Sequence, residues 1–476
     1  MKRRDFLKTA GAGVLGAAAL AGAGPLLAQS PPPPPNPPNI IYILLDDAGY
    51  GDLGCYGQQH FETPNIDRLA SEGVRFTQHY SGSAVCAPSR CSLLTGKNTG
   101  HCSIRGNREN PDGEGQFPLP EDTVTVAHRL RNAGYATGAF GKWGLGGPGS
   151  TGSPLNMGFD TFFGYLCQRQ AHDYYPTHLW HDKDKVVLDA KTYSHELIMN
   201  EAFKYIKVKG ASDRPFFCFL PVTIPHASLH VPDEWSGPFR KKFKKYNATY
   251  GMYAGRPVTN PPARFAGMMT MLDHNVGQLM RLLSDLGLDR DTVVMLASDN
   301  GPHMEGGHLP DLFNSNGPLR GYKRDLYEGG IRVPFLTRWK GRIAPGSVSG
   351  LPCAFWDVLP TLCHMAGAPV AASESGLDGV SLVPELLGVP EQQIKHDYLY
   401  WELAEQGGRQ AARRGAWKSV RYNVSDNPAA PVELYNLDED NGEQTDQSAK
   451  YPQKARDMRD LMNTVRTESD VFPLYS

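Results

Sequence analysis

The sequence has few cysteines, little net charge and no long uninterrupted apolar segment. Its 476 residues include 8 cysteines, too few for a disulfide scaffold at this length. The formal net charge of -2 gives no reason to expect a nucleic-acid or generally acidic partner. The basic run from Arg240 to Lys245 is typical of a solvated surface. We therefore expect a globular protein with one large core, a smaller companion unit and no nucleic-acid partner.

The N-terminal segment has the pattern of an export signal. Arg3 and Arg4 precede a weakly apolar Ala/Gly stretch that ends near Ala28, which resembles a bacterial twin-arginine signal. A membrane anchor is the alternative, but five glycines between residues 11 and 24 make a poor spanning helix. We predict a cleaved signal peptide at 1–30, a proline-rich linker at 31–38, recognition by the twin-arginine export machinery and a periplasmic or secreted location.

Apolar runs that end abruptly in polar residues recur along the chain. The first, residues 39–45 (NIIYILL), stops at Asp46 and Asp47, and such a continuous run is typical of a strand buried on both faces of a parallel sheet. Segments with helical signals lie between these runs, so we predict an α/β fold in which helices sandwich a large, mostly parallel sheet. The other predicted strands are 136–140 before Lys142, 215–222 before His226, and 292–298 before Asp299 and Asn300.

The polar residues at the strand ends are expected to form one site, because ligands of such sheets bind beyond the carboxyl ends of the strands. Asp46, Asp47, Asp299 and Asn300 offer only oxygen ligands, which hard cations such as Ca²⁺ or Mg²⁺ prefer. Without a cation, these carboxylates would repel and raise one another's pKa. A cation ringed by basic groups suits a tetrahedral oxyanion, so a sulfate or phosphate ester is the expected substrate. The basic residues expected here are Arg90, Lys142, His226 and Lys323.

Residues 86–90 (CAPSR), followed by LLTG at 93–96, resemble the signature of the type I sulfatases, in which an enzyme oxidises the cysteine to formylglycine. The resemblance extends over most of the chain, through 39–57, 63–80, 141–146, 225–227, 298–302 and 319–334. It implies an alkaline phosphatase-like fold, an arylsulfatase-like activity on a sulfate monoester, a bound calcium ion and a formylglycine-generating maturase that acts on Cys86. Cys91 lies outside the pattern.

The resemblance also implies residue roles. In the family's chemistry an aldehyde hydrate carries two hydroxyls; one attacks sulfur and releases the alcohol, and the other expels sulfate by carbon–oxygen cleavage. Arg90 would hold the hydrate, Lys142 and Lys323 the sulfate oxygens, and Asp299 would help to deprotonate the attacking hydroxyl. His226 with Lys323 would protonate the leaving alcohol. The implied calcium ligands are Asp46, Asp47, Cys86, Asp299 and Asn300.

One position departs from the family's pattern. The family usually has histidine where this chain has Gly144, in GKWGLG, and that histidine is assigned to the hydrate. We hypothesise that His172 or His303, both in loops expected near the strand ends, contacts the site and binds substrate instead. His172 is the favoured candidate.

From about Gly376 the pattern changes to short strands separated by turns. Residues 398–423 and 431–437 predict a small antiparallel sheet, and residues 457–469 predict a closing helix. We therefore divide the mature chain into a catalytic domain at 39–375 and a C-terminal subdomain at 376–476.

Three interpretations of the function fit the sequence. We favour a sulfatase that acts on an aryl or carbohydrate sulfate. A phosphonate monoester or phosphodiester hydrolase of the same superfamily also fits, because such enzymes use formylglycine too. Gly144 is the feature that favours the third, an exported carbohydrate-binding protein without turnover. Candidates for stacking on a sugar or aryl ring are Tyr165, Tyr174, Tyr175 and Trp180.

Overall fold

The computed structural model describes residues 36–111, 113–368, 370 and 376–475. The predicted signal peptide and most of the proline-rich linker lie outside these residues. Within the described ranges, no helix combines the length and the apolar character needed to cross a lipid bilayer.

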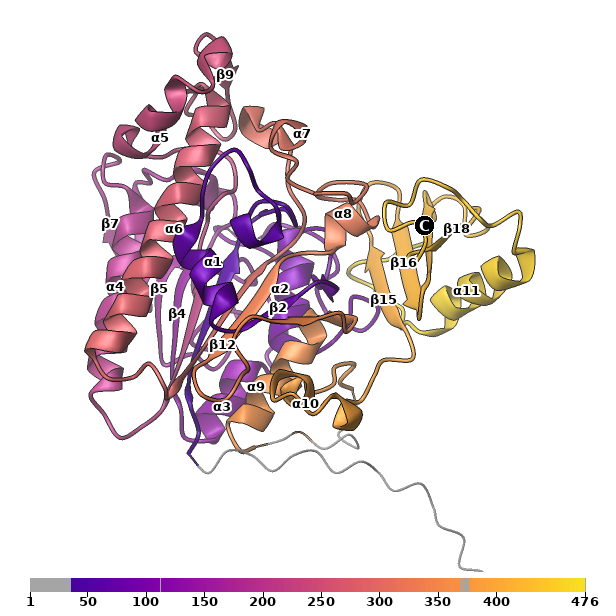
Figure 1. Ribbon diagram of the computed structural model, residues 1–476, viewed down its shortest axis with the longest axis horizontal. Coiled ribbons are helices and arrows are strands. Elements are labelled where there is room, and N and C mark those ends of the chain that lie inside the picture. Colours follow the sequence, from indigo (N-terminus) through magenta and orange to yellow (C-terminus); the bar gives the residue numbers. More distant parts are fainter. Residues whose placement is uncertain (1–35, 112, 369, 371–375, 476) are drawn as a thin grey trace, which may run out of the picture.

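A sheet of ten strands forms the centre of the molecule (Figure 1). From one edge to the other, the strands are β13 (Ser347–Ser349), β2 (Val74–Phe76), β12 (Phe335–Trp339), β11 (Thr292–Ser298), β1 (Asn39–Leu45), β8 (Phe216–Pro221), β4 (Ala136–Lys142), β5 (Thr161–Tyr165), β6 (His178–His181) and β7 (Asp184–Val187). The central strands from β11 to β5 are parallel, whereas β12 and β6 run antiparallel to their neighbours. The predicted large, mostly parallel sheet is therefore confirmed.

Helices cover both faces of this sheet, as strand β1 shows. The even-numbered residues from 40 to 44 pack into one core, and the odd-numbered residues from 41 to 45 pack into the other. This alternation arises because successive side chains of a strand point to opposite faces. The helices on the first face are α2 (Cys86–Thr95), α3 (Val126–Asn132) and α9 (Val358–Met365), and those on the second are α1 (Pro64–Ser71), α4 (Ser194–Gly210) and α6 (Pro261–Asp285) (Figure 1).

The predicted element boundaries differ from the observed ones by a few residues. Strands β1 and β11 have the predicted bounds, and β4 continues to Lys142. Helix α6 begins at Pro261, three residues before the predicted start at 264. The Asn260 side chain caps it by accepting a hydrogen bond of 3.1 Å from the Ala263 N–H, and proline is favoured in a first helical turn because its missing N–H is not needed there.

A second, antiparallel sheet of four strands lies in the C-terminal part (Figure 1). Its strands, in spatial order, are β15 (Leu399–Leu403), β16 (Arg409–Arg414), β17 (Trp417–Tyr422) and β18 (Glu433–Asn436), and α11 (Pro452–Thr464) packs on one face. The predicted small sheet with a helix is confirmed, although the helix begins at Pro452 rather than at 457. Helix α10 (Val383–Leu386) still packs into the core of the large sheet, so the domain boundary at 375/376 stays a prediction.

A buried ion cluster joins this subdomain to the large one. Lys418 Nζ on β17 lies 2.9 Å from a carboxylate oxygen of Glu328 and 2.9 Å from one of Glu443. Glu328 begins the short helix α8 (Glu328–Ile331), which directly follows the loop that carries Lys323. Since all three side chains are buried, the cluster fixes the C-terminal sheet against that loop.

Candidate active site

Sequence-distant polar residues gather beyond the carboxyl ends of the central strands. Asp46 and Asp47 follow β1, Asp299 and Asn300 follow β11, and Lys142 ends β4. Strands β1 and β11 pair in parallel, and the Asp47 N–H donates a hydrogen bond of 3.0 Å to Asp299 Oδ1. The structure thus brings the predicted strand-end residues to one edge of the sheet.

The backbone of Asp47 allows two consecutive carboxylates to enter the same site. On a regular strand, Asp46 and Asp47 would point to opposite faces. Asp47 has a φ of 68°, in the left-handed region that residues other than glycine rarely adopt and that Asp tolerates better than most. This turn breaks the alternation, and such strained residues cluster at functional sites.

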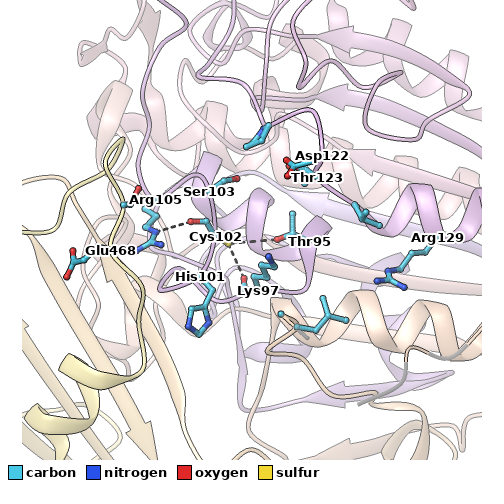
Figure 2. Close-up of a pocket in the computed structure, with 15 residues that line it drawn as sticks. Thr95, Lys97, His101, Cys102, Ser103, Arg105, Asp122, Thr123, Arg129 and Glu468 are labelled. Carbon is cyan, nitrogen blue, oxygen red and sulfur yellow. Dashed lines mark hydrogen bonds between the residues drawn. The ribbon is translucent and has the colours of Figure 1, made fainter. Parts of the chain in front are cut away.

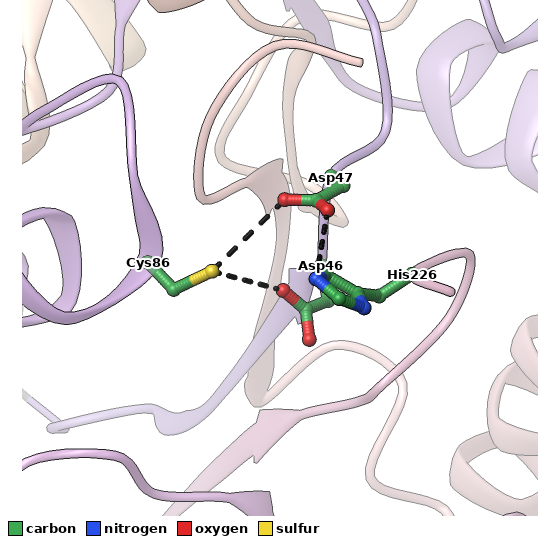
Figure 3. A group of neighbouring side chains, drawn as sticks. All are labelled: Asp46, Asp47, Cys86 and His226. Carbon is green, nitrogen blue, oxygen red and sulfur yellow. Dashed lines mark hydrogen bonds and ion pairs between the residues drawn. The ribbon is translucent and has the colours of Figure 1, made fainter. Parts of the chain in front are cut away.

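Cys86 lies at the first turn of α2 and faces these carboxylates (Figure 3). Its Sγ atom is 3.5 Å from Asp46 Oδ1, 4.0 Å from Asp47 Oδ1 and 3.5 Å from Lys142 Nζ. Burial raises the pKa of the Cys86 thiol well above its usual range. An unmodified Cys86 is therefore a protonated thiol and a poor nucleophile, since the thiolate is the reactive form.

Buried basic groups pair with Asp46 and Asp299. Lys142 Nζ lies 2.7 Å from Asp46 Oδ2, and Arg90 Nη2 lies 2.8 Å from Asp299 Oδ2. Burial alone would raise the pKa of Asp46, but the charge of Lys142 and of the other nearby basic groups holds it well below its usual range. Burial and the charge of Asp46 raise the pKa of Asp299 to about 7, although Arg90 opposes this shift.

A second group of contacts surrounds Asp47. Lys323 Nζ lies 2.8 Å from Asp47 Oδ2 and 2.9 Å from His226 Nε2, and Asn300 Nδ2 donates to Asp47 Oδ1 at 2.7 Å. Burial, with the charge of Lys323, holds the pKa of His226 well below its usual range. Burial alone would lower the pKa of Lys323, but the charge of Asp47 raises it well above its usual range. These shifts favour a charged Lys323 beside a neutral His226.

These residues form a candidate metal site. One possible ligand atom from each of Asp46, Asp47, Cys86 and His226 lies within 4.8 Å of the others (Figure 3). Asn300 Oδ1 is buried and, within the described part of the chain, accepts no hydrogen bond. Carboxylate and amide oxygens are the ligands of hard cations, so the side chains of Asp46, Asp47 and Asn300 fit Ca²⁺ or Mg²⁺, whereas an unmodified thiol and an imidazole do not.

His172 and His303, which were considered as replacements for the family's usual histidine at position 144, both lie against His226. The ring centroid of His172 is 4.7 Å from that of His226, with the planes 5° apart. The His303 ring stacks on His226 at 5.4 Å and 24°. The three imidazoles therefore form one stack, with His226 in the middle.

Gln168 fills the space beside Gly144. Gly144 has a φ of 77°, and a Cβ atom added to it would lie 2.5 Å from Gln168 Nε2. The backbone N–H of Gln168 donates to Gln116 Oε1 at 2.6 Å, while its buried Nε2 has no hydrogen-bond partner among the described residues. A search of the sequence for substitute histidines misses this amide, because nothing local relates residue 168 to residue 144.

Two of the tyrosines considered as stacking surfaces lie in the core. Tyr165 and Tyr174 are fully buried, and the Tyr174 hydroxyl donates to the His226 carbonyl at 2.9 Å. These two therefore pack the core rather than offer a face to a substrate, and Tyr174 also holds the His226 loop. A residue without any sequence signal lies at the site instead: the Tyr253 ring is 4.8 Å from that of His172.

A cavity of about 480 Å³ lies apart from this site, beside the end of α2 (Figure 2). Its lining includes Thr95, Cys102 and Arg105, and the Arg105 Nη1 atom is 2.7 Å from Glu402 Oε1. None of the predicted site residues is among those that line it. This cavity is therefore distinct from the cluster around Cys86.

Comparison with known proteins decides the family. Residues 38–368 match the family described as Sulfatase. The chain belongs to the sulfatase family. It is 33% identical to arylsulfatase A of Homo sapiens over 433 residues, which cover 85% of this chain and 82% of that protein. It is 32% identical to N-acetylgalactosamine-6-sulfatase of Canis lupus familiaris, over 74% of this chain and 66% of that protein.

Similarity of structure agrees with this membership. The crystal structure of Ps i-CgsB in complex with k-i-k-neocarrahexaose matches this sulfatase with a TM-score of 0.76 and 27% identity, and the match covers 90% of this chain and 92% of that one. The alkaline phosphatase-like fold implied by the sequence is thereby confirmed. This sulfatase is a sulfuric ester hydrolase.

Proposed function

We propose that this sulfatase hydrolyses a sulfate monoester of a carbohydrate or aryl alcohol, with formylglycine formed from Cys86 and a calcium ion bound beside it. The observation that carries the proposal is the place of Cys86 Sγ, within 4.0 Å of the carboxylates of Asp46 and Asp47 and 3.5 Å from Lys142 Nζ. In the mature enzyme, the oxygen atoms of residue 86 would stand where this sulfur lies. Relatives named arylsulfatase A and N-acetylgalactosamine-6-sulfatase support both substrate classes.

Calcium would be held by oxygen atoms from two strand ends and from α2. When bound, it would neutralise the clustered carboxylates and polarise a sulfate oxygen. Mg²⁺ prefers the same oxygen ligands and is the alternative ion. The proposed ligands are Asp46, Asp47, Asp299, Asn300 and residue 86.

The basic side chains would bind the ester and stabilise its developing charge. Formylglycine at position 86 would supply a hydrated aldehyde with two hydroxyls on one carbon, one to attack sulfur with loss of the alcohol, and one to lose its proton and expel sulfate by carbon–oxygen cleavage. Asp299 would accept the proton of the attacking hydroxyl. Arg90 fixes Asp299 with two N–H contacts of 2.8 and 3.1 Å to Oδ2, and Lys142 would hold sulfate oxygens.

Lys323 would donate the proton that the leaving alcohol requires. It lies 2.9 Å from His226 Nε2, so the two groups can share one proton at the leaving-group side. The rings of His172 and His303 pack against the two sides of His226 and restrict its orientation. We keep His172 as the histidine that contacts the substrate, because it is partly exposed whereas His303 is fully buried.

The test is to express the chain with a formylglycine-generating maturase and measure the mass of the peptide that spans residue 86. We expect the aldehyde, and we expect kcat/KM for a sulfate ester to exceed that for a phosphonate ester of the same phenol. Cys86→Ala should abolish turnover, while Cys91→Ala in the same helix, outside the site, should keep most of it. A dominant phosphonate activity, or full activity in Cys86→Ala, would overturn the proposal.

We also infer that residues 1–30 direct export by the twin-arginine route, to the periplasm or beyond. Because this route carries folded proteins, the maturase would act on Cys86 before export. Replacing Arg3 and Arg4 by lysine should leave the protein in the cytoplasm, as measured by cell fractionation. Unchanged export would contradict this inference.

A further inference from the structure

Two partly exposed rings border the buried reaction centre. Cys86 and His226 are each 2% exposed, whereas His172 and Tyr253 are half-buried. The Tyr253 ring centroid lies 4.8 Å from that of His172 and 5.9 Å from that of His226. Since His226 and Lys323 are proposed to face the leaving alcohol, these two rings lie where the rest of the leaving group must pass.

The loop that carries Tyr253 is fixed against the site. It connects the two-stranded hairpin of β9 (Tyr250–Gly251) and β10 (Val258–Thr259), and the Ser228 hydroxyl donates a hydrogen bond to the Tyr253 carbonyl. Gly251 is packed so closely that an added Cβ atom would lie 1.8 Å from the Gly306 carbonyl oxygen. The Tyr253 ring is therefore positioned before any ligand binds, which lowers the entropic cost of binding.

Charged side chains lie around the same ring. Burial raises the pKa of Tyr253, and the nearby charges of Lys323 and Arg324 oppose the shift while Glu305 adds to it. Arg324 Nη1 pairs with Glu305 Oε1 at 2.5 Å, and the Arg324 side chain is 33% exposed. An apolar ring face bordered by hydrogen-bonding groups suits a pyranose, which has an apolar C–H face and a rim of hydroxyls.

We propose that Tyr253 and His172 form the wall of the leaving-group subsite, and that this wall packs against the C–H face of a pyranose in a sulfated carbohydrate. The inference rests on the proposed function, because it uses the assignment of His226 and Lys323 to the leaving alcohol. Tyr253 is then a specificity-determining residue that contacts substrate but takes no part in proton transfer.

The test compares Tyr253→Ala, Tyr253→Phe and Tyr250→Ala on two kinds of substrate. One is a panel of monosulfated hexoses and hexosamines that differ in the sulfated position, and the other is 4-nitrophenyl sulfate. Tyr250 is 71% exposed on the same hairpin, which makes it the matched control. For the best saccharide, Tyr253→Ala should lower kcat/KM by about tenfold, mainly through KM, because the ring binds ground state and transition state alike. Tyr253→Phe should stay within about threefold of the wild type, since it keeps the ring.

Each outcome separates the two proposals. If the wild type hydrolyses 4-nitrophenyl sulfate but no saccharide of the panel, or if Tyr253→Ala loses no more saccharide activity than Tyr250→Ala, the pyranose wall is wrong and the proposed function stands. If the enzyme with a verified aldehyde at residue 86 hydrolyses neither kind of sulfate ester, the proposed function fails and the wall fails with it. A larger loss in Tyr253→Ala on the saccharide than on 4-nitrophenyl sulfate supports the inference.

Discussion

Replacing Gly144 by alanine tests whether Gln168 occupies the place that a side chain at this position would need. Two costs add at this site. Gly144 has a φ of 77°, and the left-handed region costs an L-residue about 1–2 kcal/mol. The added Cβ would also lie 2.5 Å from Gln168 Nε2 and 2.9 Å from its Cγ, and such overpacking costs about 1–3 kcal/mol. Gly144→Ala should therefore lower the free energy of unfolding by about 2–5 kcal/mol.

A neighbouring glycine separates these two costs. Gly149 has a φ of 70°, but no atom lies within 4 Å of an added Cβ. Gly149→Ala should therefore show the backbone cost alone, about 1–2 kcal/mol. Adding Gln168→Ala to Gly144→Ala should recover about 1–3 kcal/mol, because the truncated side chain no longer fills the space.

Urea unfolding followed by tryptophan fluorescence gives these differences from the shift of the midpoint at a constant slope. The reasoning is refuted if Gly144→Ala is no less stable than Gly149→Ala, or if the effects of Gly144→Ala and Gln168→Ala simply add. Gly144→His, which restores the family's usual residue, should also lower the free energy of unfolding, because Gln168 already fills the space beside residue 144.

Further predictions concern the proton donor, the buried ion cluster and the metal. Lys323→Met should lower kcat for an alkyl or saccharide sulfate by about a hundredfold or more. The loss should be smaller for 4-nitrophenyl sulfate, because its leaving group needs little protonation. Equal losses on both kinds of substrate would contradict the role of Lys323 as proton donor. Burial and the charge of Glu328 raise the pKa of Glu443 from 4.5 to about 7, against the charge of Lys418, so the folded state binds this proton more tightly than the unfolded state. The resulting stabilisation of the folded state, about 3 kcal/mol, is complete below pH 4.5 and is lost as the pH rises through 7. Glu443→Gln should therefore flatten the fall in melting temperature between pH 5 and 8. An unchanged slope in this variant would argue against the raised pKa of Glu443. Dialysis against a chelator should lower both the activity and the melting temperature, and Ca²⁺ should restore both, because clustered carboxylates repel without a cation; an enzyme indifferent to chelation would exclude the proposed calcium site.

Much of the large sheet could be predicted because its signals are local. The side chains from Ile40 to Leu45 alternate between two cores, so this part of the strand is hydrophobic on both faces, and the break at Asp46 marks the strand end. The parallel arrangement then predicts that such ends converge. The resemblance of residues 86–90 to a family signature supplied the residue roles, which periodicity alone does not provide.

The substrate side of the site could not be predicted in this way. Tyr253 and His172 lie 81 positions apart in the sequence, in loops without periodicity, and only the packed fold brings their rings to 4.8 Å. The same holds for Gln168, whose amide lies beside Gly144 because β4 and β5 are neighbours.

The sequence by itself determined the central strands β1, β4, β8 and β11, their polar ends and the residue that the family modifies, because each of these is written within a few consecutive residues. Only the tertiary structure showed that the rings of His172 and Tyr253 lie beside His226, what fills the space at Gly144, and which side chains contact Lys323. The physical reason is that burial, steric exclusion and the pKa of a group depend on atoms that are close in space, and the two side chains that contact Lys323 Nζ, those of Asp47 and His226, lie 276 and 97 positions away in the sequence.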